Sequence, residues 1–173
     1  MDTSPSFSGE ADTLEVDRLC GHHRTSDFDC GDSYYNERLT TFQERFEAGD
    51  KVLGFVVRDS RMAVHAYVIV LETVFVEEDT GRELRCFTVP AIGVDRRSRG
   101  EDLLVRRLIA RSVEAMAERE RSAGPLGAPY AGVICMPGDN QTLKRLLETL
   151  AFEPIGEGAL YWRDRQQASP GDS

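Results

Sequence analysis

The sequence has no apolar run as long as the roughly 18 to 20 residues that a membrane-spanning helix requires. Its longest apolar stretch is interrupted by His65 and Glu72. The first eleven residues are polar and acidic, so they lack the apolar centre of a secretory signal. We therefore expect a cytoplasmic protein with no membrane partner.

Cysteine pairs of the C-x-x-C type are also missing, because the four cysteines are Cys20, Cys30, Cys86 and Cys135. This spacing excludes a ribbon-type zinc site and a small disulfide scaffold. The segment from Cys20 to Cys30 reads C-x-H-H-x6-C, which contains ligand-type residues but matches no standard zinc spacing. We predict no metal site, and we expect the thiols to be reduced, as in cytosolic proteins.

Positive charge is scarce, since 21 lysines and arginines face 30 acidic residues and the formal net charge is −9. Neutralisation of phosphates by cationic side chains drives non-specific binding to nucleic acids. A surface that binds tRNA or DNA along its whole extent is therefore disfavoured. Residues 96–121 nevertheless contain eight arginines against five acidic residues, a local net charge of +3. This segment is either a basic patch or a solvated helix with charge pairs four residues apart.

The 173 residues correspond to about one domain, and a 40% apolar, 29% charged composition is that of an ordinary globular protein. Residues 1–10 and 166–173 are polar and rich in Ser, Pro and Gly, so they have no apolar contacts to offset the entropy of ordering. We expect both ends to be disordered and residues 11–165 to form a single domain.

Hydrophobic periodicity predicts an α/β (α+β) protein with the element order β, α, β-β-β, α, β, α, β-β, in which helices cover the faces of a mixed sheet. Asp32 is a candidate N-cap for the first helix, which should stop at Gly49. Pro90 lies inside a strand and predicts a bulge there. The expected strands are 13–19, 52–58, 62–76, 84–94, 130–136, 152–155 and 159–163, and the expected helices are 32–48, 103–121 and 140–150.

The junction from Ala91 to Leu104 carries the clearest functional signal. A strand enters a helix there through a turn rich in Arg and Gly. The N-terminus of a helix presents unpaired backbone N–H groups and the positive end of the helix dipole, which together suit a phosphate group. The junction is therefore a candidate anion-binding site.

The element order, the pattern V-D-x-x-x-R-G from Val94 to Gly100, and the segment from Asn140 to Phe152 together resemble the GNAT superfamily of acyl-CoA-dependent N-acetyltransferases. The segment Phe28-Asp29-Cys30-Gly31, followed by the first helix, is similar to the toxin branch of this superfamily, which acetylates aminoacyl-tRNA. The resemblance implies a mostly antiparallel sheet that splays open in the middle, and acetyl-CoA as cosubstrate.

The resemblance also implies roles for individual residues. Backbone groups of Ile92, Gly93 and Val94 would pair with the pantetheine arm, and Asn140 would contact the same arm. The strands that end at Val94 and Met136 would diverge, leaving a cleft lined by residues 92–94 and Cys135. The pyrophosphate loop would consist of Arg99, Gly100, Glu101, Asp102, Leu103 and Leu104.

Four positions depart from the family pattern. Asp102 and Leu104 replace small residues of R/Q-x-x-G-x-G/A, Leu147 stands where a tyrosine often protonates the leaving thiolate, and Ala151 replaces a glycine. A carboxylate about 4 Å from a phosphate charge costs roughly 1 to 4 kcal/mol. Alternatively, Asp102 is an acid at a helix start, stabilised by the dipole.

Glu72 is a candidate general base, because a carboxylate in an apolar cleft has a raised pKa; the alternative is that it points to solvent. Tyr130, Tyr161 and Cys135 are substitutes for the missing acid, although Cys135 also suits a small buried hydrophobic position. These residues complete the set of catalytic candidates.

The main hypothesis is an acetyl-CoA-dependent N-acetyltransferase that acts on an unidentified amine, either a small molecule or a macromolecule. One alternative is a catalytically degenerate module on the same scaffold, which binds or regulates another molecule. The other is toxin-type acetylation of aminoacyl-tRNA, against which the net charge weighs. A second copy of the chain and an antitoxin-like protein are the partners that the resemblance leaves open.

Overall fold

The computed structural model describes residues 13–48, 53–76, 78–100, 102–122, 130–155 and 160–164. The ends for which disorder was expected lie outside these ranges. The strands are β1 (Glu15–Arg18), β2 (Leu53–Arg58), β3 (Val64–Val76), β4 (Glu83–Val94), β5 (Gly132–Cys135), β6 (Glu153–Ile155) and β7 (Leu160–Asp164). The helices are α1 (Ser33–Glu47), the short 3-10 helix η1 (Arg96–Ser98), α2 (Asp102–Ser122) and α3 (Gln141–Thr149).

Within the described residues the strands form one seven-stranded sheet in the order β1-β2-β3-β4-β5-β7-β6. Each adjacent pair is antiparallel except β4 and β5, which are parallel. The expected element order and the mixed, mostly antiparallel sheet are therefore confirmed. None of the described helices has the length and apolar character needed to cross a bilayer.

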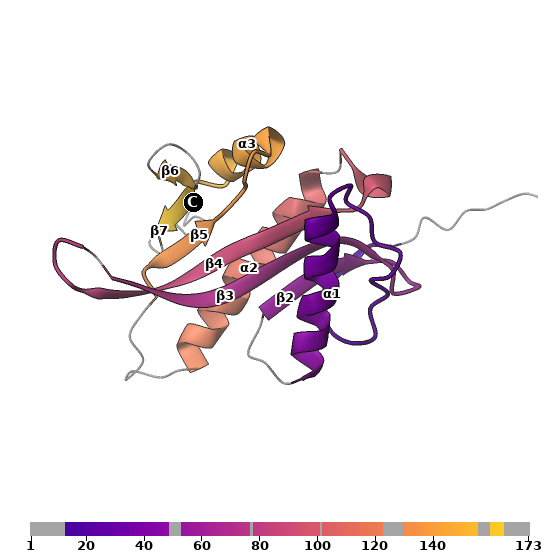
Figure 1. Ribbon diagram of the computed structural model, residues 1–173, viewed down its shortest axis with the longest axis horizontal. Coiled ribbons are helices and arrows are strands. Elements are labelled where there is room, and N and C mark those ends of the chain that lie inside the picture. Colours follow the sequence, from indigo (N-terminus) through magenta and orange to yellow (C-terminus); the bar gives the residue numbers. More distant parts are fainter. Residues whose placement is uncertain are drawn as a thin grey trace, which may run out of the picture.

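Alternation along the central strands divides the core between the two faces of the sheet. On β3, Ala66 and Val68 pack with α2 and α3, whereas Tyr67 and Ile69 pack with α1. Successive side chains of a strand point to opposite faces, so an uninterrupted apolar strand serves two helical layers at once. Figure 1 shows α1 and α2 on opposite sides of the sheet, as the sequence predicts.

Pro90 marks the place where the sheet changes. Opposite it, the register between β3 and β4 shifts, so that Ile69 faces Ala91 but Leu71 faces Thr88. Proline has no N–H to donate to a ladder, and the predicted bulge is present. The parallel pairing of β4 with β5 ends at Val89 and Cys135, while β4 continues to Val94. The last five residues of β4 therefore have an edge that β5 leaves free.

Two side chains fix the helices that flank this opening. The carboxylate of Asp32 accepts a hydrogen bond from the Tyr34 N–H at 2.9 Å, which confirms the predicted N-cap of α1. The amide of Asn140 caps α3 in the same way, accepting from the Leu143 N–H at 3.0 Å. The expected stop signal of α1, Gly49, lies outside the described residues; the helix ends at Glu47.

Ala151, at the position where the family pattern has glycine, has a positive φ of 61°. An alanine in this left-handed conformation costs the folded state about 1 to 2 kcal/mol, and a glycine would remove this cost. Glycine also has a greater conformational entropy in the unfolded chain, which cancels part of the gain. We expect Ala151→Gly to raise the free energy of unfolding by about 0.5 to 1 kcal/mol, measured by urea denaturation. The control is Ala110→Gly, at an exposed position inside α2, which should lower it by a similar amount. Equal losses in both variants would contradict the expectation.

Candidate functional site at the sheet opening

A cleft of about 840 Å³ lies where β4 and β5 diverge. One wall is residues 92–94 of β4 together with Arg99, Gly100 and Asp102 of the turn into α2. Residues 136–140, which connect β5 to α3, form the second wall, and the start of α1 closes the third side. The volume is within the range of small-molecule sites in proteins.

The two motifs of the sequence analysis touch each other beside this cleft. The Arg96 N–H donates to the Asp29 carbonyl at 2.8 Å, and the Asp29 N–H donates to the Asp95 carboxylate at 3.1 Å. The Arg99 guanidinium donates to the Cys30 carbonyl at 2.7 Å. The segment Phe28–Gly31 and the turn after β4 therefore form one hydrogen-bonded unit, although 65 or more residues separate them in the chain.

Asp95 is the centre of this unit and its side chain is only 2% exposed. Its carboxylate accepts from the Arg97 N–H at 2.9 Å and from the Arg97 Nε at 2.7 Å. Burial alone would raise the pKa of Asp95, but the bonds from Arg97 and from the Asp29 N–H outweigh it and hold this pKa below its ordinary value. Asp95 is thus a charged anchor at the entrance to α2.

Asn36 holds the Phe28–Gly31 segment together, and the sequence analysis missed it. Its side-chain oxygen accepts from the Cys30 N–H at 2.9 Å, and its NH₂ donates to the Asp29 carboxylate at 3.2 Å. Gly31, with a φ of +83°, donates its N–H to the same carboxylate at 2.7 Å. The hydrogen bond from the Gly31 N–H is the largest cause that lowers the pKa of Asp29, and the hydrogen bond from Asn36 is the second.

The turn is also anchored from β3, by a second set of residues that sequence reasoning missed. The Ser98 hydroxyl lies 2.8 Å from His65 Nδ1, and His65 Nε2 lies 3.3 Å from the Asp59 carboxylate. Ser98 is 4% exposed, so its hydroxyl is a structural contact rather than an accessible nucleophile. The sequence holds no local signal for this contact, because its partners come from β3, η1 and the turn between β2 and β3.

Seven of the residues assigned to the cosubstrate line the cleft: Ile92, Gly93, Val94, Arg99, Gly100, Asp102 and Asn140. Two do not. Leu103 is 63% exposed on the surface of α2, and Leu104 is 2% exposed and packed in the core, because the apolar stripe of α2 begins with it. Glu101 lies outside the described residues.

Gly93 has a packing reason to be glycine, independent of any ligand. A Cβ at this position would lie 2.4 Å from the Tyr67 ring and 3.1 Å from the Phe28 ring. Those rings contact each other edge to face, with centroids 5.4 Å apart, and Tyr67 is fully buried. The phenylalanine of the Phe28–Gly31 segment is therefore a core residue directly behind the cleft wall.

Glu72 and Tyr130 do not line the cleft, and the raised pKa expected for Glu72 is wrong. The Arg85 guanidinium forms an ion pair with Glu72 and also lies 3.2 Å from the Tyr130 hydroxyl, while Arg119 is 3.8 Å from Glu72. The hydrogen bond from Arg85 holds the pKa of Glu72 below its ordinary value, and burial raises the pKa of Tyr130. Glu72 therefore forms a salt bridge that joins β3 to β4.

Of the other expected acids, Cys135 also does not line the cleft. Cys135 is 1% exposed, and burial raises the pKa of its thiol to about 12. The expectation that it lines the cleft is wrong, since its side chain faces the core between the sheet and α2. Leu147 is fully buried in the same core, whereas Leu143 and Leu146 line the cleft. The side chain of Tyr161 lies outside the described part of the structure.

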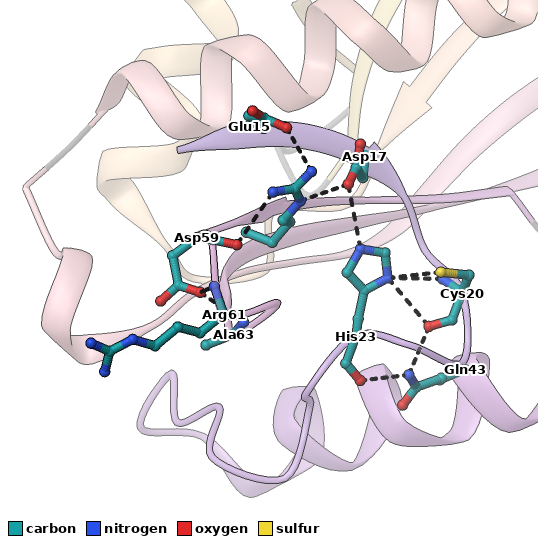
Figure 2. Close-up of polar contacts among 9 residues, drawn as sticks. Glu15, Asp17, Cys20, His23, Gln43, Asp59, Arg61 and Ala63 are labelled. Atoms are coloured by element: carbon teal, nitrogen blue, oxygen red, sulfur yellow. Dashed lines mark hydrogen bonds and ion pairs between the residues drawn. The ribbon is translucent and has the colours of Figure 1, made fainter. Parts of the chain in front are cut away.

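Away from the cleft, Cys20 and His23 lie together in the loop between β1 and α1 (Figure 2). His23 Nδ1 accepts from the Cys20 N–H at 3.0 Å and is 3.3 Å from the Cys20 thiol, and His23 Nε2 is 3.9 Å from the Asp17 carboxylate. No group of three or more metal-ligating side chains is found among the residues that the structure describes.

Burial lowers the pKa of His23, and the hydrogen bond to Cys20 and the charge of Asp17 offset only part of this effect. The unfolded chain therefore binds a proton at His23 more readily than the folded protein does. The neutral, buried His23 contributes its full stability above the unfolded pKa, near 6.5, and this contribution is lost as the pH falls through the folded pKa. We expect the free energy of unfolding to fall between pH 7 and pH 5.5, and to fall less in His23→Gln. His22→Gln, at an exposed position of the same turn, should keep the parent slope. A parent slope in His23→Gln would refute this assignment.

A sheet that opens between its one parallel strand pair among the described strands, with the turn into α2 on one wall of the opening, is the architecture of the GNAT acetyltransferase fold. No protein-family model matches the chain, and no curated protein matches its sequence. Among solved structures, a variant of the toxin AtaT bound to acetyl-CoA and the C-terminus of the antitoxin AtaR has a TM-score of 0.72 and 19% identity, covering 91% of this chain and 96% of that one.

Two further structures give the same result. AtaT complexed with acetyl-methionyl-tRNAfMet has a TM-score of 0.71 and 16% identity, covering 89% of this chain and 96% of that one. The KacTA–DNA complex has a TM-score of 0.72 and 16% identity, covering 90% and 96%. The chain therefore has the toxin-like GNAT fold of AtaT and KacT; at this identity the likeness establishes the fold alone.

Proposed function

We propose that the protein is an N-acetyltransferase that transfers the acetyl group of acetyl-CoA to an amine. The observation that carries this proposal is the free edge of β4 after Val89, which meets the Arg99–Gly100 turn inside one cleft. A strand edge offers backbone N–H and C=O groups to the amides of a pantetheine arm, as a further strand would. Similar folds bind acetyl-CoA, as the AtaT complex does.

The residues of the cleft fit this cosubstrate on two of three counts. Gly100 has a φ of +91°, and apart from its chain neighbours no atom of the described residues lies within 4 Å of the place where a Cβ would be, so the backbone of the turn is open to a phosphate. Arg99 supplies a positive charge beside it. Asp102 fits poorly, because its exposed carboxylate lines the same wall. The open backbone at Gly100 and the charge of Arg99 favour binding, and the charge of Asp102 opposes it, so we expect a moderate affinity.

The chain acts in this proposal mainly by positioning. Backbone groups of residues 92–94 orient the thioester, and the amine nitrogen attacks its carbonyl carbon while the C–S bond breaks. Backbone N–H groups at the free edge stabilise the oxygen of the tetrahedral intermediate. Glu72 does not line the cleft, so water takes the proton of the amine.

The test is a calorimetric titration with acetyl-CoA, followed by an assay of thiol release with a panel of amines. The panel includes methionine amide, spermidine and methionyl-tRNA. Binding together with release above the rate of hydrolysis supports the transferase. Binding without release from any acceptor favours the degenerate module that binds or regulates. The absence of both heat and a thermal shift rules out the proposal.

Methionyl-tRNA is in the panel because of a second candidate function, toxin-type acetylation of aminoacyl-tRNA. The docking of the Phe28–Gly31 segment onto the turn after β4 favours it, since this segment is the part of the sequence that resembles the toxin branch. AtaT has been solved with an acetylated aminoacyl-tRNA and with the antitoxin AtaR. An antitoxin-like partner belongs to this candidate. The net charge of −9 predicts weak tRNA binding, because few cationic side chains are available to neutralise phosphates.

A further inference from the structure

The proposed reaction releases a thiolate, and in the described part of the structure two of the residues expected to protonate it, Tyr130 and Cys135, do not line the cleft. Leu147 is fully buried and has no proton to give. Tyr130 and Cys135 face other parts of the molecule. An unassisted thiolate is a poorer leaving group than a thiol, so a proton donor in the cleft would accelerate the step.

Tyr35 lines the cleft from the first part of α1, on the third side of the cleft. Its hydroxyl lies 3.8 Å from the place where a Cβ of Gly138 would be, so the side chain reaches from α1 to the connection between β5 and α3. The Tyr67 hydroxyl donates to the Tyr35 carbonyl at 2.7 Å and fixes the backbone. The backbone of Tyr35 is therefore anchored beside the cleft, and its phenol extends toward Gly138.

The Tyr35 hydroxyl is free to donate, since it has no hydrogen-bond partner within the described ranges of the chain. The other tyrosine of the cleft, Tyr34, accepts a hydrogen bond from Arg38 at 2.7 Å and is 52% exposed, so it is the more solvated of the two phenols. The Cys30 thiol is also engaged, as it donates to the Asp32 carbonyl at 3.6 Å. The remaining ionisable groups of the cleft are three aspartates and Arg99.

We propose that the Tyr35 hydroxyl is the general acid of the acetyl transfer; this inference rests on the proposed function. The amine nitrogen bonds to the acetyl carbon, the C–S bond breaks, and its electron pair takes the proton of the Tyr35 hydroxyl, giving free thiol. The proton that the amine loses passes to water, and the Tyr35 phenolate takes one back from water. A phenol with the ordinary tyrosine pKa is already protonated at neutral pH, and burial raises the pKa of Tyr35 further, so the proton is present to be donated.

The test compares Tyr35→Phe with Tyr130→Phe, which removes a phenol hydroxyl outside the cleft. The acyl donor is acetyl-CoA, and the acceptor is the amine of the panel that the parent protein acetylates fastest. We expect kcat to fall about 10²- to 10⁴-fold in Tyr35→Phe. The Kd for acetyl-CoA and the melting temperature should stay at the parent values, because the ring and its packing are kept. Tyr130→Phe should keep the parent kcat.

The outcomes separate this inference from the function on which it rests. If the parent neither binds acetyl-CoA nor releases thiol, both the proposed transferase function and the role of Tyr35 are wrong. If the parent turns over and Tyr35→Phe keeps its kcat, the general acid is wrong while the transferase stands. If Tyr35→Phe loses affinity for acetyl-CoA in proportion to its loss of kcat, Tyr35 binds the cosubstrate and does not protonate the thiolate. The general acid is wrong in that case as well.

Discussion

Replacing Asp95 with asparagine is expected to lower the free energy of unfolding by about 2 to 4 kcal/mol. The carboxylate is 2% exposed and accepts hydrogen bonds from the Arg97 backbone, the Arg97 guanidinium and the Asp29 N–H. An asparagine amide presents one acceptor oxygen and one NH₂ group, so at least one of these donors would face another donor. A donor left unpaired at a buried site keeps its full desolvation cost.

Urea denaturation measures this loss, with Asp27→Asn as the matched control. Asp27 also forms an arginine pair, with Arg24 at 2.7 Å, but both side chains are more than half exposed. Exposed pairs contribute about 0 to 1 kcal/mol, so the control should change little. Similar losses in the two variants would show that Asp95 is no stronger an anchor than a surface ion pair.

Most of the fold follows from local sequence patterns, because each depends on residues that are close in the chain. The apolar run of β3 predicts a strand buried on both faces, and both of its faces are covered. Asp32 and Asn140 are recognisable as N-caps, since a cap bonds residues two or three positions ahead. Pro90 predicts the bulge because its missing N–H is a property of one residue.

The candidate site could be predicted only in part, because it depends on contacts between distant segments. Glu72 looks like a lone carboxylate in an apolar strand, and its partner Arg85 is apparent only once the register of β3 and β4 is known. Tyr35 lies in the same helical stripe as Leu39 and Phe42, so periodicity assigns it to the core. It lies at the end of that stripe, where the helix passes the open edge of the sheet.

Arg99→Ala is expected to weaken acetyl-CoA binding about 5- to 150-fold, the equivalent of about 1 to 3 kcal/mol for a charged hydrogen bond. Arg99 is exposed, lines the cleft, and is held in place by the Cys30 carbonyl. The control is Arg111→Ala, because Arg111 is paired with Glu114 and Glu118 on α2 and does not line the cleft. Calorimetric titration measures both, and equal losses would indicate a general effect of positive charge.

The opposite change at the same wall, Asp102→Asn, decides between the two interpretations of that carboxylate. If it opposes the pyrophosphate, removing its charge should tighten acetyl-CoA binding about 3- to 30-fold at low ionic strength, and the gain should shrink as salt screens it. The same change weakens the helix start by about 0.3 to 1 kcal/mol through the lost dipole interaction, which denaturation detects separately. A loss of stability without tighter binding would mean that Asp102 serves only the N-terminus of α2. The phosphates would then lie closer to Gly100, where the backbone is open.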